Sequence, residues 1–151
     1  MPRYYEDLEA GDTYALEGRY EVDREEITAF AEQYDPQPFH LDEAAAADSV
    51  FGGLIASGWH TAAMSMRLVV DDFLDPETSM GASGVEDLEW IEPVRPGDTL
   101  RIEIEVLETR PSENRPEMGH VRMELTGYNQ HDDAVIEWVS DGMVRRRNPG
   151  E

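Results

Sequence analysis

One apolar helix, followed by a run of alternating segments, constrains the fold of this chain more than any other feature. Between residues 57 and 74, apolar side chains occupy most of the circumference of a helix, which predicts a helix buried on nearly all sides. After Pro76 the hydrophobic period changes to two, and residues 85–91, 99–108, 120–129 and 134–144 are expected to be strands. A single buried helix with several later strands predicts an α+β fold, with an antiparallel sheet wrapped around the helix.

The first third of the chain is expected to carry a strand and two helices. Residues 11–22 alternate, and Asp23 with Glu26 three places later has the spacing of a capping box for a helix that runs to about residue 34. Residues 42–47 predict a short second helix capped by Asp42. With 151 residues and no linker or repeat, the chain is expected to form a single domain over residues 1–151.

The segment 34–40, Tyr-Asp-Pro-Gln-Pro-Phe-His, places a carboxylate and an imidazole on a stiff stretch of backbone. Pro36 and Pro38 fix φ and favour extended geometry before them, so the segment is expected to form a stiff turn after the helix. Asp35 and His40 are residue types that move protons near neutral pH, and a rigid backbone keeps them within reach of a substrate. The alternative is that His40 is a structural histidine and Asp35 ends a helix.

A second candidate feature lies at the start of the long helix. Ser57 is a good N-cap, and the amides of Gly58 and Trp59 then lack acceptors within the helix. Such amides stabilise a carboxylate, a phosphate or a carbonyl oxygen that gains negative charge. Ser57 and Gly58 are therefore candidate oxyanion or substrate-binding residues.

These two blocks together resemble the MaoC-like dehydratases, a family that includes the R-specific enoyl-CoA hydratases. The family motif is Asp-x-Asn-Pro-x-His followed by Phe-Gly-x-x-Ile-Ala-x-Gly. Gln37 stands here where Asn is usual, and Ser57 where His is common. The resemblance continues at residues 5–12 and 93–100, so it covers nearly the whole chain. The matching positions are Asp35, Pro38, His40, Phe51, Gly52, Ile55, Ala56 and Gly58.

The resemblance implies a hot-dog fold and reversible addition of water to a trans-2-enoyl thioester, with acyl-CoA as the partner. Asp35 and His40 would hold the water, with the roles of base and acid left open, and the Gly58 amide would bind the thioester oxygen. No cofactor or metal is expected. The chain is expected to form a homodimer or a higher homo-oligomer. Two alternatives stay open: a hot-dog acyl-CoA thioesterase, and a non-catalytic acyl-thioester binding protein.

Composition restricts the environment and the partners. The net charge is −22, and all 12 basic residues are Arg. An acidic chain without Lys is expected of a protein from a halophile, and it argues against nucleic acid and anionic membranes as partners. The chain has no Cys, no apolar run of membrane length and no signal-like N-terminus, so a cytoplasmic protein is expected. Residues 145–147, Arg67 and Arg95 are weaker candidates for contact with coenzyme phosphates.

Overall fold

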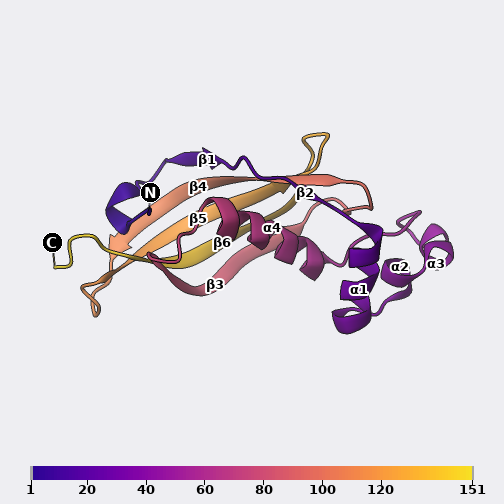
Figure 1. The fold of residues 1–151 in the computed structure, drawn as a ribbon, viewed down its shortest axis with the longest axis horizontal. Helices are drawn as coiled ribbons and strands as arrows, with labels where there is room; N and C mark the ends of the chain where they lie inside the picture. Colours follow the sequence, from indigo (N-terminus) through magenta and orange to yellow (C-terminus); the bar gives the residue numbers. More distant parts are fainter. Residues whose placement is uncertain (1, 151) are drawn as a thin grey trace.

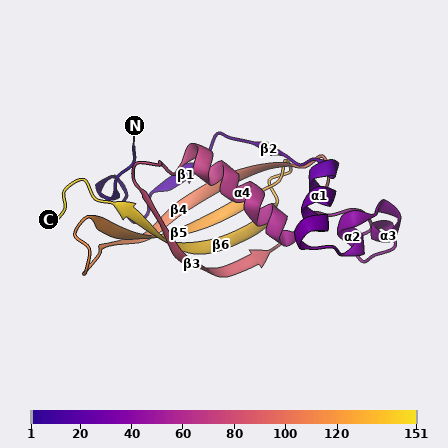
Figure 2. The ribbon, with the colours of Figure 1, turned by 60° about the horizontal axis from the view of Figure 1, so that its bottom comes forward.

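Antiparallel strands in the order β1-β4-β5-β6-β3 form the sheet of the computed structural model, which describes residues 2–150. A short strand, β2, pairs with one end of β4 (Figure 1). The sheet curves around helix α4, Gly58–Asp72, which crosses its concave face (Figure 2). The strands are β1 Thr13–Ala15, β2 Tyr20–Glu21, β3 Ser79–Trp90, β4 Thr99–Pro111, β5 Met118–Tyr128 and β6 Ala134–Arg145.

The core lies between α4 and the inner face of the sheet. Because side chains alternate along a strand, β4 sends every second residue inward, from Leu100 to Val106. Met64 and Leu68 of α4 pack in the same buried cluster. The strands that carry the period of two therefore pack against the apolar helix as predicted, and the α+β fold is confirmed.

Three further helices lie together beyond one end of the sheet, whereas both chain termini lie at the opposite end (Figure 1). They are α1 Arg24–Tyr34, α2 Pro38–Leu41 and α3 Glu43–Ala47, and a 3-10 turn, η1, covers Tyr5–Asp7 near the N-terminus. This arrangement brings the C-terminal end of α1 to the N-terminal end of α4.

The structure corrects three local predictions. Residues 11–22 form two short strands, β1 and β2, because the backbone leaves the sheet between them. The side chain of Asp23 caps α1 by accepting from Glu25 N, but Glu26 does not complete a capping box and contacts Tyr20 and His60 instead. The helix α4 is not buried on all sides, because the sheet covers only one of its faces.

The uncovered side of α4 is a stripe of apolar side chains one to two turns apart. Trp59, Met66 and Val70 are 60 %, 43 % and 49 % exposed. The strand β3, an edge of the sheet, adds Val85 and Trp90 as further exposed apolar residues. These five residues are called the apolar stripe below.

Candidate active site

The helix α1 ends at Asp35, which places its carboxylate at the meeting point of α1 and α4. The Asp35 amide still donates to Ala31 O, but φ of −152° and the following Pro36 end the helix there. Pro38 then occupies the first turn of α2, a position that proline tolerates, and α2 carries His40. The predicted stiff turn is thus a break between two helices, with Asp35 and His40 on either side of it.

The structure brings Asp35, His40 and Ser57 together. The Asp35 Oδ2 atom lies 3.3 Å from His40 Nε2 and accepts a hydrogen bond from Ser57 Oγ at 2.7 Å. The Asp35 Oδ1 atom accepts from Gln37 Nε2 at 2.6 Å. Burial by itself would raise the pKa of Asp35, but the hydrogen bonds from Ser57 and Gln37 and the contact with His40 outweigh it, so this pKa lies below its ordinary value. Asp35 is therefore ionised at neutral pH.

His40 is held in one orientation by a backbone carbonyl. Its Nδ1 atom lies 2.8 Å from Ile55 O, and a carbonyl oxygen only accepts, so Nδ1 carries a proton. The other ring nitrogen, Nε2, faces the Asp35 carboxylate. A direct contact between Nε2 and that carboxylate requires a second proton on the ring, whereas a neutral ring requires a bridging water. Either arrangement prepares the pair to share protons.

The hydroxyl of Ser57 links the pair to the start of α4. Ser57 is the N-cap: its Oγ accepts from Trp59 N at 3.3 Å while donating to Asp35. The side chain is fully buried. Its proton is therefore engaged by Asp35, and a substrate-binding role for Ser57 stays a prediction. The neighbouring Gly58 amide has no acceptor among residues 2–150, as expected for an oxyanion donor.

A pocket of about 460 Å³ opens beside these groups, lined by Asp35, His40 and Gly58. Trp90, at the end of β3, forms one wall and donates from Nε1 to Gly58 O at 2.7 Å. Its indole lies so close to Gly58 that a Cβ built there would be 2.4 Å from Trp90 Cε2. Sequence reasoning missed Trp90, because 32 residues separate it from Gly58 and no motif marks the contact.

The other singled-out residues have structural roles. Asp42 accepts from Ala45 N at 3.1 Å and caps α3, as predicted. His60 is a buried, packed histidine: Nε2 lies 3.2 Å from Glu26 Oε1, and the ring stacks on Phe30 with centroids 4.7 Å apart. Burial lowers the pKa of His60 more than Glu26 raises it.

The C-terminus lies at the opposite end of the molecule from α1 (Figure 1). Arg147 pairs with Asp7 at 2.7 Å, and Arg146, with 7 % of its side chain exposed, reaches Glu6 at 3.9 Å. These contacts fasten the chain end to η1. No helix among residues 2–150 has the length and apolar character needed to cross a bilayer.

An antiparallel sheet wrapped around one long helix defines a hot-dog domain, and here an Asp–His pair lies beside the N-terminal end of that helix. The "MaoC like domain" family matches residues 7–129, and the chain belongs to this family. The predicted resemblance and hot-dog fold are confirmed.

Several relatives place the chain within the family. The uncharacterised protein YdeM of Bacillus subtilis is 33% identical over 125 residues, 83% of this chain and 87% of that protein. The 3-hydroxybutyryl-CoA dehydratase of Methylorubrum extorquens is 35% identical over 114 residues, 74% of this chain and 69% of that protein.

Two solved structures share the architecture. The MaoC-like dehydratase from Rhodospirillum rubrum is 44% identical with a TM-score of 0.88, covering 95% of this chain and 97% of that one. The R-hydratase PhaJ1 from Pseudomonas aeruginosa is 28% identical with a TM-score of 0.78, covering 97% and 88%.

Proposed function

We propose that this protein adds water reversibly to a trans-2-enoyl thioester of coenzyme A, giving a 3-hydroxyacyl thioester. The observation that carries the proposal is the joint position of an ionised Asp35, an oriented His40 and the open Gly58 amide around one pocket. The dehydratase and R-hydratase relatives support the same chemistry.

The contacts of the pair suggest which residue takes which proton. Asp35 is the base, because its hydrogen bonds keep it ionised, and it removes a proton from water as the water oxygen bonds to the β-carbon. His40, with Nδ1 held by a carbonyl, delivers the Nε2 proton to the α-carbon. Asp35 is then protonated and His40 neutral, and transfer across their 3.3 Å contact restores both.

The thioester oxygen carries the negative charge that develops between these two steps. We assign the Gly58 amide to this oxygen, because it has no other acceptor among residues 2–150 and begins a helix. A donor in this role typically contributes about 3 kcal/mol to the stability of the transition state.

The acyl chain is assigned to an apolar pocket two to three turns further along α4. This pocket holds about 210 Å³ and is lined by Met66 and Val69 of α4 and by Leu125 and Trp138 of the sheet. It lies on the side of α4 that carries part of the apolar stripe.

A second copy of the chain is proposed to cover the apolar stripe. β3 is a long edge strand, and an unpaired edge beside exposed apolar side chains is a typical site of strand pairing. We therefore expect a homodimer, measured by light scattering during gel filtration. A monomer at micromolar concentration would contradict this assembly.

The decisive experiment follows the ultraviolet absorbance of the enoyl thioester after addition of crotonyl-CoA in concentrated potassium chloride. The wild type should remove the absorbance without releasing thiol, whereas Asp35→Asn should lose about 10²–10⁴-fold in rate. Thiol release by the wild type would favour a thioesterase. Unchanged binding with no turnover in either protein would favour the binding-protein alternative.

Asp42→Asn is the matched control for Asp35→Asn. It makes the same chemical change at a cap of α3, seven residues away in the sequence and without a role in the proposed reaction. Its rate should stay close to that of the wild type. A loss equal to that of Asp35→Asn would mean that the rate reports on local folding and not on proton transfer.

A further inference from the structure

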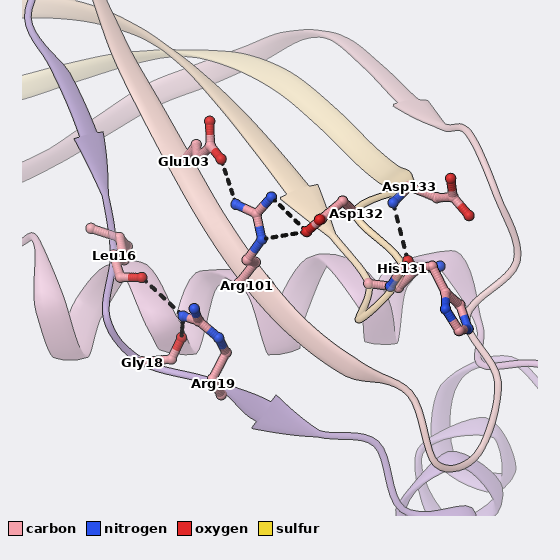
Figure 3. Close-up of polar contacts among 9 residues, drawn as sticks. Leu16, Gly18, Arg19, Arg101, Glu103, His131, Asp132 and Asp133 are labelled. Carbon is pink, nitrogen blue, oxygen red and sulfur yellow. Dashed lines mark hydrogen bonds and ion pairs between the residues drawn. The ribbon is translucent and has the colours of Figure 1, made fainter.

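The arginines of this chain differ sharply in whether a carboxylate neutralises them. Seven of the 12 have a carboxylate oxygen within 4.0 Å. Figure 3 shows one of them, Arg101, held by Glu103 and Asp132. Arg19, in the same view, donates to backbone carbonyls. In a chain of net charge −22, an arginine without a carboxylate is the exception.

Five arginines have no carboxylate partner among residues 2–150, and one of them lies beside the candidate active site. This is Arg95, which directly follows Pro93 and Val94 in the wall of the pocket. The others are on different surfaces: Arg3 stacks on Tyr14 and Phe73, Arg145 donates to Glu77 O, and Arg110 lies on the outer face of the sheet. The fifth is Arg19.

One terminal nitrogen of the Arg95 guanidinium, Nη2, is held by a hydrogen bond within the protein, and the other, Nη1, faces Gly53. The Nη2 atom donates to the carbonyl oxygen of Phe51 at 2.6 Å, and Phe51 lines the pocket. A Cβ built on Gly53 would lie 3.2 Å from Arg95 Nη1, so the guanidinium packs directly against the backbone of this glycine. The Gly53 amide has no acceptor among residues 2–150.

We propose that Arg95 and the Gly53 amide bind the phosphate that ends the pantetheine arm of the substrate. This inference rests on the proposed thioester chemistry and assigns a site that this chemistry does not require. An oriented guanidinium with free N–H groups suits a phosphate, and a backbone amide beside it adds a further donor. Glu92 also lines the pocket, so an anionic substrate needs a local cation there.

The same phosphate occurs in coenzyme A and in the prosthetic arm of a carrier protein, so the substrates of the test must separate these sources. Four crotonyl thioesters are compared at one fixed salt concentration: those of coenzyme A, carrier protein, 4′-phosphopantetheine and pantetheine, which has no phosphate. Arg95→Gln should raise KM about tenfold, equivalent to ~1.4 kcal/mol, for phosphate-bearing thioesters and leave the pantetheine thioester unchanged. If Arg95→Gln raises KM more for one of the coenzyme A and carrier-protein thioesters, that thioester is the natural substrate.

Two controls separate phosphate binding from a structural effect. Arg110→Gln removes an equally unneutralised arginine from the outer face of the sheet and should leave every KM unchanged. Arg95→Lys keeps the charge and should recover part of the lost affinity. Isothermal titration of free coenzyme A measures the same site without turnover, with weaker binding expected for Arg95→Gln than for the wild type.

The inference fails if Arg95→Gln raises KM equally for the pantetheine thioester, because Arg95 would then act by supporting Phe51. It also fails if neither KM nor coenzyme A binding changes. Failure of the proposed reaction looks different: the wild type itself would then leave the pantetheine thioester and all other crotonyl thioesters intact.

Discussion

Gly58→Ala should destabilise the protein, and the reason is one neighbouring side chain. A Cβ at this position would lie 2.4 Å from Trp90 Cε2 and 2.6 Å from Trp90 Nε1, so the indole must move. Movement breaks the hydrogen bond from Nε1 to Gly58 O. Overpacking costs about 1–3 kcal/mol and a lost hydrogen bond about 0.5–1.5 kcal/mol. Because Trp90 is 45 % exposed and can swing outward, the total should be about 1–2 kcal/mol.

Removing the indole should abolish or slightly reverse the destabilisation that Gly58→Ala causes. Alanine is better than glycine in a helix by up to about 1 kcal/mol, and Gly58 begins α4. In a Trp90→Ala background, Gly58→Ala should therefore be neutral or slightly stabilising. The coupling energy of the double-mutant cycle should be about 1–2 kcal/mol.

The assay is urea unfolding of four proteins at one salt and one protein concentration: wild type, both single variants and the double variant. The hydration rate is measured in parallel, because an indole displaced from the pocket wall should disturb the substrate beside the Gly58 amide. If Gly58→Ala lowers the free energy of unfolding equally in the wild-type and Trp90→Ala backgrounds, the clash with Trp90 is not the cause of the destabilisation.

Three further predictions follow from single contacts or from charge. Ser57→Ala removes a hydrogen bond that lowers the pKa of Asp35, so the acidic limb of the pH–rate profile should move to higher pH. Because burial lowers the pKa of His60, the unfolded chain binds its proton more readily, and stability should fall as pH drops below about 6.5. Between pH 7 and 5, His60→Gln should lose less unfolding free energy than the wild type, as measured by urea unfolding. His131→Gln changes a histidine in a turn and should follow the wild type. With a net charge of −22, the melting temperature should rise between about 0.1 and 2 M potassium chloride, and a flat curve would contradict the halophile interpretation.

The fold and the Asp35–His40 pair were readable from the sequence because their signals are local. The period of two along β4, β5 and β6 follows from one buried face, and Pro36 and Pro38 mark the end of α1 within a few residues. The strand β3 was predicted too short because residues 79–84 include Gly81 and Gly84 and lack the alternation of apolar and polar residues that marks the other strands.

The remaining parts of the site depend on contacts between distant segments. Nothing near Ser57 in the sequence shows that its hydroxyl donates to Asp35, 22 residues earlier. The same holds for Trp90 over Gly58 and for Arg95 at Phe51 O, 44 residues away. Each contact exists because the sheet and α4 bring loop ends together, and neither periodicity nor a short motif records that packing.

The position of the Asp35 carboxylate relative to the Gly58 amide is set by how α1 packs on α4, since Asp35 ends one helix and Gly58 begins the other. Ser57 joins these ends directly, serving as N-cap of α4 and as donor to Asp35. A second attachment lies further back on α1, where Glu26 contacts His60. Glu26 and Asp35 are roughly 13 Å apart along the axis of α1 at ~1.5 Å per residue. Two attachments at that separation resist pivoting of α1 better than Ser57 alone could, which explains how a helix outside the sheet can hold the Asp35 carboxylate steady.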